Sequence, residues 1–403
     1  MKPATSRRLR PLLGALFIAL AALLGWLAFS KKSAPPVLSQ QAPSVRPAPA
    51  SPPALYPPTA ASPKPALVAD QPSAATRAAL LRTLAALRAL QGGGAPAETQ
   101  ARELLDRLRD ELVAGDLAGT VAAIVEFLRG GEDAATPFAF TMEDGGALSA
   151  APSLRTFLLD QLGRLDPVAA ADFTREFLAA PLSPAAVPDE SSLALRNLAW
   201  GSPGPLADAD RAVFDARITA LLQNPDWAVR PSAGFLEGFD AVVFSGNPAL
   251  VAPLAALLDE AAAPSTRHAA HIAMDRLALA GDRAVIAAIA TEPGLSAQPG
   301  LRAGLLARAD VTDAAQRSTI ETYLRDPAVT DAEKKTFITT FPLRSFTDGP
   351  RLITQPADPE GADLMTADRA SLVVMREWAT DPALAPLHPS LSASITRLES
   401  MLR

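Results

Sequence analysis

The chain has 403 residues, a formal net charge of −6 and no cysteine; 49% of its residues are hydrophobic, but only 5% are aromatic. This length is sufficient for two or three domains whose core is built mainly from aliphatic side chains and alanine. The lack of cysteine excludes disulfides, thiol nucleophiles, cysteine-type zinc sites and lipidated cysteine anchors. With three histidines in all, metal sites and histidine-based catalysis are hard to assemble.

Charge is distributed unevenly along the chain. Residues 1–75 carry eight basic side chains and one acidic side chain, whereas residues 76–403 carry 29 basic and 42 acidic side chains, a net charge of −13. An acidic domain repels the phosphate backbone of DNA and RNA, so we expect no nucleic-acid partner.

Residues 11–29, PLLGALFIALAALLGWLAF, contain no charged side chain. A helix of this length spans about 28 Å, close to the hydrocarbon thickness of a bilayer. Three arginines within residues 1–10 precede the segment, and the positive-inside rule places that side in the cytoplasm. We expect a single-pass signal-anchor helix in the inner membrane of a bacterial envelope, with the C-terminal domain in the periplasm.

The alternative is a cleaved signal peptide, because Ala28-Phe29-Ser30 places small residues at the −3 and −1 positions of a cut near Ser30. The apolar stretch is longer than a typical signal-peptide core, and Lys31 and Lys32 would follow the cut, so the anchor is favoured. Cleavage would give a secreted protein, and both interpretations export the C-terminal domain.

Residues 30–75 are expected to form a linker, because residues 34–75 contain 12 prolines. Proline lacks an amide donor and disfavours helix at the preceding residue. We expect an extended polyproline II spacer, or alternatively a disordered tether; either holds the domain away from the membrane.

Residues 76–403 are predicted to form an all-α domain, because successive segments show the hydrophobic periodicity of amphipathic helices. The expected helices cover residues 73–90, 96–112, 116–129, 152–165, 167–180, 190–200, 208–223, 226–244, 248–261, 265–280, 282–291, 297–309, 312–325, 330–340, 363–380 and 388–402. Several begin at an Asp-Pro or Asn-Pro step, which supplies a cap and a preset φ angle. Residues 137–142 are the one candidate for extended structure.

Residues 226–291 suggest how these helices are arranged. The segment Asp226-Trp-Ala-Val-Arg-Pro-Ser-Ala-Gly-Phe-Leu236 resembles the D-x-x-V-R-x-x-A-x-x-x-L helix of HEAT repeats, with its last leucine one position early. Residues 266–277, with small alanines, are followed by a Gly-Asp turn and a second apolar helix, and this order is also similar to a HEAT repeat. The resemblance implies an irregular HEAT-like α-solenoid of helical hairpins; a compact helical bundle is the alternative.

The best metal candidate is one helix that carries His268, His271 and Asp275 on one side. Two imidazoles and a carboxylate could bind zinc and leave a fourth position open. The alternative is that these are ordinary polar positions, and we predict no cofactor. His388 precedes a proline at a helix start, where a capping or packing role is expected.

Two acidic segments are expected to be structural. Glu143-Asp144-Gly145-Gly146 is typical of a turn. A second set of acidic side chains leads into a predicted helix, where the positive end of the helix dipole favours negative charge. Calcium binding is the alternative. The members of this set are Asp358, Glu360, Asp363 and Asp368.

Residues 334–352 are the best candidate for a partner-binding surface, because they combine aromatic and basic side chains in a proline-interrupted segment. The candidate residues are Lys334, Lys335, Phe337, Phe341, Arg344, Phe346 and Arg351. The alternative is that the phenylalanines pack under the loop and seal the C-terminal end of the domain.

The sequence contains no nucleophile elbow, zinc-protease, phosphate-binding or dinucleotide-binding motif. We therefore expect a membrane-anchored scaffold or adaptor that binds protein partners through a helical-repeat surface, without catalysis. One alternative is an enzyme with a carboxylate-based active site, which requires a cleft where two acids with shifted pKa values converge. The other is a metal or small-ligand sensor around His268 and His271.

Overall fold

The computed structural model describes residues 71–403 except 92–93, 183–186, 203, 281, 346 and 355–360. The chain divides into two units, Met1–Ala66 and Leu67–Arg403, and all described residues belong to the second. The predicted anchor at residues 11–29 and nearly all of the predicted linker lie outside the described residues. Within the described part of the chain, no helix is both long and apolar enough to cross a membrane.

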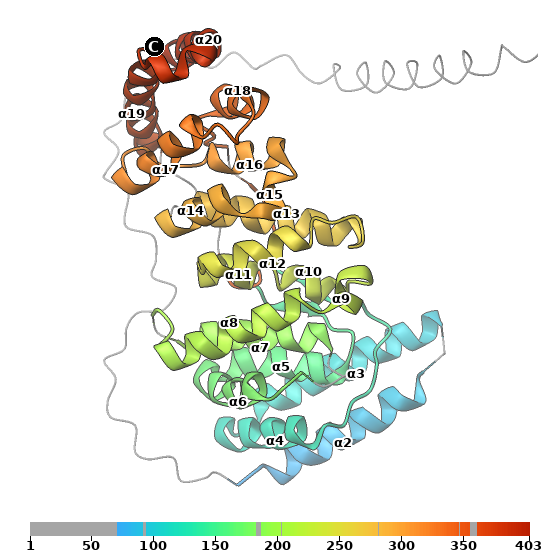
Figure 1. Cartoon of the computed structure of the whole chain (residues 1–403). Coiled ribbons are helices and arrows are strands. Elements are labelled where there is room, and N and C mark those ends of the chain that lie inside the picture. Colours follow the sequence, from blue (N-terminus) through green and yellow to red (C-terminus); the bar gives the residue numbers. More distant parts are fainter. Residues whose placement is uncertain are drawn as a thin grey trace, which may run out of the picture. The chain divides into compact units, whose positions relative to one another are not determined.

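The described residues are mostly helical, which confirms the predicted all-α class (Figure 1). The α-helices are α2 (Ala74–Ala89), α3 (Ala95–Ala114), α4 (Leu117–Gly130), α5 (Leu154–Leu165), α6 (Pro167–Ala179), α7 (Pro188–Trp200), α8 (Asp208–Leu222), α9 (Pro225–Val229), α10 (Ala233–Glu237), α11 (Asp240–Ser245), α12 (Val251–Ala256), α13 (Pro264–Leu279), α14 (Arg283–Thr291), α15 (Pro293–Ser296), α16 (Pro299–Leu306), α17 (Ala314–Arg325), α18 (Asp331–Thr340), α19 (Gly361–Trp378) and α20 (His388–Met401). Two 3₁₀ helices cover Pro248–Leu250 and Pro382–Leu387. An antiparallel hairpin joins β1 (Thr141–Met142) to β2 (Leu148–Ala150), at the end of the segment predicted to be extended.

Helix starts follow the predicted capping chemistry. The side chains of Asp166, Asn224, Asn247 and Asp381 each accept hydrogen bonds from backbone N–H groups of the first turn, and a proline follows each of them. These bonds satisfy donors that have no partner within the helix. Asp326 also accepts a bond from a backbone N–H, but no helix starts there, because the following residues form a turn.

The prediction of a single helix over residues 226–244 is wrong. Helix α9 ends at Val229 and α10 begins at Ala233, because Pro231 has no amide donor and disfavours helical geometry before it. Ser232 then caps α10 by accepting a hydrogen bond of 3.1 Å from the backbone N–H of Phe235. The pattern that resembles a HEAT helix therefore extends over two short helices.

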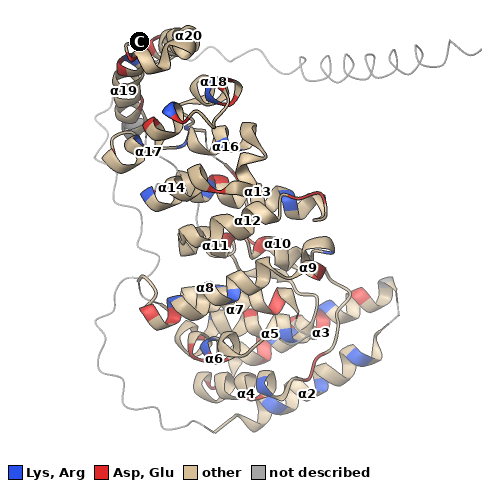
Figure 2. Ribbon diagram, in the orientation of Figure 1, with Lys and Arg blue, Asp and Glu red and all other residues tan. Residues whose placement is uncertain are grey.

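The helices of this unit lie in successive layers that follow the sequence, from α2–α4 to α19 and α20 (Figure 1). Helix α6 packs against α7, α14 against α17, and α16 against α18. The buried side chains form two hydrophobic clusters, one chiefly from α2–α6 and the other from α6–α20. Basic and acidic residues occur along the whole stack (Figure 2).

An extended segment after α18 runs back along the stack, and we call its described residues, 343–345 and 347–354, the strap. At its start, the backbone N–H of Leu343 donates to the carbonyl of Ala307, at 2.8 Å, beside α16. Near its end, Leu352 is fully buried in the N-terminal cluster, and Ile353 packs against both clusters. The strap therefore connects helices that are far apart in the sequence.

Buried ion pairs hold the strap in place. Arg308 forms a bidentate pair with Asp275 of α13, at 2.6 and 2.7 Å, and also donates to the carbonyl of Ser345 at 2.6 Å. Arg276 of α13 lies 3.0 Å from Asp240 of α11 and donates to the carbonyl of Pro350. A guanidinium has five donors, so one side chain can bind a carboxylate and a strap carbonyl together.

Asp240 is the most completely buried of these carboxylates, with no exposed surface. It accepts hydrogen bonds from the backbone N–H groups of Ile353, at 2.6 Å, and Thr354, at 2.7 Å. The hydroxyl of Thr354 donates to it as well, at 2.6 Å. The carboxylate thus satisfies three donors of the strap.

Asp240→Ala should lower the free energy of unfolding by about 3 kcal/mol or more, because it leaves buried donors and the Arg276 charge without a partner. Urea unfolding of the full chain, followed by circular dichroism, measures this loss. Asp226→Ala is the control, since that carboxylate pairs with Arg230 on the surface, where both side chains are about 80% exposed, and it should cost less than about 1 kcal/mol. Equal losses in the two variants would show that the strap contacts do not stabilise the fold.

Candidate functional site

The predicted metal ligands do not come together around one position. His268 and His271 are exposed on α13, whereas Asp275 is buried and its two oxygens bind Arg308. Within the part of the chain that the structure describes, no group of three His, Cys, Asp or Glu side chains is arranged to hold a metal ion. His388 begins α20, and its Nε2 lies 3.1 Å from the carbonyl oxygen of Asp381, consistent with the predicted capping or packing role.

The acidic segment near α19 is only partly described. Asp358 and Glu360 lie outside the described residues, as does the side chain of Asp363. Asp368 lies within α19, where its Oδ1 is 3.7 Å from Nε of Arg344.

Two residues predicted to contact a partner are instead core residues. Phe337 and Phe341 have no exposed surface; their rings stack with centroids 5.3 Å apart, and both rings lie against Trp378. Helix α18 turns this face inward against α16 and α20, so the two rings cannot serve as surface contacts. The alternative expectation, that phenylalanines seal the C-terminal end, describes these two correctly. Lys334, on the same helix, is also buried.

The remaining residues of that predicted surface differ in their environment. Lys335 is exposed on α18, and Phe346 lies outside the described residues. Arg344 is half-buried beside Asp368, and Arg351 is held by Asp348 at 2.7 Å. The two arginines of the segment thus face acidic side chains of the fold itself.

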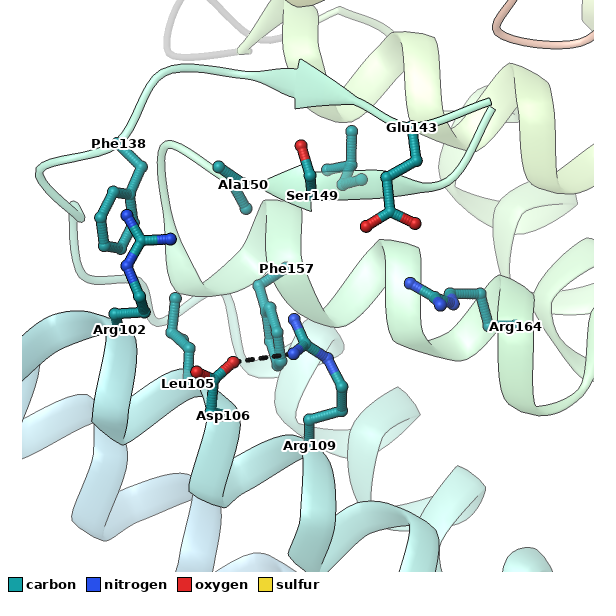
Figure 3. Close-up of a pocket in the computed structure, with 12 residues that line it drawn as sticks. Arg102, Leu105, Asp106, Arg109, Phe138, Glu143, Ser149, Ala150, Phe157 and Arg164 are labelled. Carbon is teal, nitrogen blue, oxygen red and sulfur yellow. Dashed lines mark hydrogen bonds and ion pairs between the residues drawn. The ribbon is translucent and has the colours of Figure 1, made fainter. Parts of the chain in front are cut away.

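A pocket near the other end of the domain gathers three arginines, none of which was among the predicted site residues. We call it the arginine pocket; its volume is about 180 Å³. Arg102 and Arg109 enter it from α3, Arg164 enters from α5, and the β1–β2 hairpin covers it (Figure 3). Glu143 reaches over it from the hairpin (Figure 3).

Aromatic rings support two of the guanidinium groups. The guanidinium carbon of Arg102 lies 5.0 Å from the centroid of the Phe138 ring. That of Arg109 lies 5.5 Å from the centroid of the Phe157 ring. A ring face attracts a cation and leaves the N–H edges of the guanidinium available to a ligand.

All three arginines keep unused donors, and the buried Nε of Arg109 has no hydrogen-bond partner among the described residues. Arg109 is paired with Asp106, at 2.8 Å. The shortest ion pair of Arg164 is with Asp160 at 3.6 Å, beyond hydrogen-bond distance, and that carboxylate already accepts a bond of 2.7 Å from Arg196. Arg102 forms no hydrogen bond or ion pair with the described residues.

The hairpin that covers the pocket is held by buried contacts. Its turn contains Gly145 and Gly146 with φ angles of 90° and 81°, which confirms the predicted turn and suits residues without a Cβ. The carbonyl of Gly146 accepts a bond of 2.7 Å from Arg196, which is completely buried. A Cβ atom added to Gly146 would overlap the carbonyl oxygen of Leu352, so the strap lies directly against this turn.

One pair of acids has the shifted pKa values that a carboxylate-based active site requires. Burial raises the pKa of Asp240 and that of Glu237, and the charge of Asp240 raises the pKa of Glu237 further. However, the strap covers these groups: Asp240 has no exposed surface, and Glu237 accepts a bond from the backbone N–H of Arg351. Their contacts indicate that both acids position the strap.

Part of the arginine pocket is visible in the sequence. Arg102 and Arg109 are seven residues apart, a spacing that places both on one outward face of the predicted helix. The unpaired character of Arg102 and the approach of Arg164 and Phe138 depend on how the hairpin folds over α3, which periodicity does not specify.

No protein-family model, curated protein or solved structure was found to match this chain.

Glu237→Gln should stabilise the protein at neutral pH, because a neutral amide avoids the cost of burying a charge and can still accept the bond from Arg351. Because the pKa of Glu237 is raised in the folded state, its contribution to the free energy of unfolding is most favourable at low pH. That contribution is lost as the pH rises through the pKa of the folded state. The stability gap between variant and parent should therefore widen from pH 4 to pH 8, by about 1.4 kcal/mol for each unit of elevation. Urea unfolding of parent and variant from pH 4 to pH 8 measures this difference, with Glu132→Gln, at an exposed position, as control. A difference that narrows toward pH 8 would contradict a raised pKa for Glu237.

Proposed function

We propose that this protein is a membrane-anchored scaffold or adaptor, outside the cytoplasm, that binds a partner protein without catalysis. In this proposal residues 11–29 are the anchor and residues 30–75 the spacer. The helical unit is the part that recognises the partner.

We further propose that the helices form an irregular HEAT-like α-solenoid. The layered order of the helices supports this arrangement, since stacked helical hairpins present long surfaces on which other proteins can bind. The break at Pro231 and the variable helix lengths make each layer different from its neighbours.

The arginine pocket is the observation that most directly supports a binding function. Arginine beside aromatic rings is the composition of protein-binding hot spots. Here Arg102 lies over Phe138 and Arg109 over Phe157, in a pocket open to solvent. Arg102 and Arg164 have donors that the described fold does not use.

In-cell crosslinking of the tagged full chain, followed by mass spectrometry, tests this function. We expect one or a few envelope proteins to be recovered, and recovery to fall about fivefold or more in the Arg102→Gln/Arg164→Gln double variant. Arg107→Gln is the matched control, because Arg107 is an exposed arginine on the same helix that does not line the pocket. Recovery of no protein other than the chain itself would contradict an adaptor function.

A further inference from the structure

We infer that the arginine pocket binds a carboxylate carried by an acidic segment of a partner polypeptide. This inference rests on the proposed adaptor function and specifies the chemistry that the partner must present.

The donors in the pocket suit a carboxylate. The guanidinium of Arg102 comes from α3 and that of Arg164 from α5, so the two approach the cavity from different elements (Figure 3). Each presents a planar set of N–H donors, which matches the two oxygens of a carboxylate. Phe138 supports Arg102 from the ring face, which leaves the guanidinium edge directed to a ligand.

The charge balance favours a singly charged ligand over a phosphate. Three arginines and the two acids Asp106 and Glu143 line the pocket, which leaves one excess positive charge. Residues 76–403 as a whole carry a net charge of −13, so the surroundings repel a dianion more strongly than a single carboxylate.

Glu143 allows a test in which a substitution should strengthen carboxylate binding instead of weakening it. Its carboxylate projects from the hairpin over the cavity and forms no ion pair with the described residues (Figure 3). It therefore opposes an incoming carboxylate and competes with it for Arg164. Removing its charge should strengthen binding, whereas removing charge from the arginines should weaken it.

Fluorescence anisotropy with the full chain in detergent measures binding of two labelled probes. One is a deca-glutamate with the fluorophore on its N-terminus and an amidated C-terminus, which presents side-chain carboxylates in every register. The other is a (Gly-Ser)₅ peptide with the fluorophore on its N-terminus and a free C-terminus, which presents a terminal carboxylate alone. We expect Arg102→Gln and Arg164→Gln each to weaken binding about fivefold, Glu143→Gln to strengthen it, and Arg107→Gln to leave it unchanged.

Binding of deca-glutamate with this variant pattern supports the inference, whereas binding of the second probe alone would overturn it in favour of a chain terminus. The inference is overturned if neither probe binds, if binding is indifferent to Arg102 and Arg164, or if a phosphoserine peptide binds the pocket more tightly than deca-glutamate. The same variants in the crosslinking experiment separate the two claims. A partner captured equally by parent and double variant would refute carboxylate binding in the pocket but not the adaptor function. Deca-glutamate binding without any captured partner would refute the adaptor function but not carboxylate binding in the pocket.

Discussion

The buried carboxylate of Asp240 is the contact on which the arrangement of this domain depends. Removing a carboxylate from water is costly unless charge and hydrogen bonds replace the lost hydration. Here Arg276 supplies the charge, and Ile353 and Thr354 supply the donors, so one side chain joins α11, α13 and the strap. Each partner is stabilised by the others, and Arg276 also donates to the hydroxyl of Thr354. The strap is therefore fixed along the stack even though its described residues have no regular secondary structure.

Through the strap, the C-terminal layers contact the hairpin that covers the arginine pocket. Leu352 is buried in the N-terminal cluster, and its carbonyl lies against Gly146 in the hairpin turn. Arg196 holds the same turn from the other side while it binds Asp160. Buried pairs of arginine and acid thus recur from α5 to α18, and the last of them joins Arg302 to Glu333 at 2.7 Å.

Local features of this fold could be predicted from the sequence, but its long-range contacts could not. Amphipathic periodicity located most helices, and Asp-Pro and Asn-Pro steps located their starts, because both signals act within a few residues. The same reasoning overlooked the break at Pro231, although proline carries that information. It left open whether Phe337 and Phe341 lie at a surface or in the core, because composition alone does not say which helix face is turned inward. The spacing of Arg102 and Arg109 was visible, but the approach of Arg164 depends on tertiary packing.

The most direct test of the link between strap and pocket is hydrogen exchange, measured by mass spectrometry, in the full chain and its Asp240→Asn variant. Asparagine preserves the shape of the side chain but removes the charge that binds Arg276. We expect exchange to accelerate in peptides covering residues 347–354 and also in peptides covering residues 141–150, which do not contact Asp240 directly. Exchange in α20 should stay unchanged, which separates this effect from global unfolding. Acceleration confined to the strap, with the hairpin as protected as in the parent, would contradict the claim that the strap holds the pocket in place.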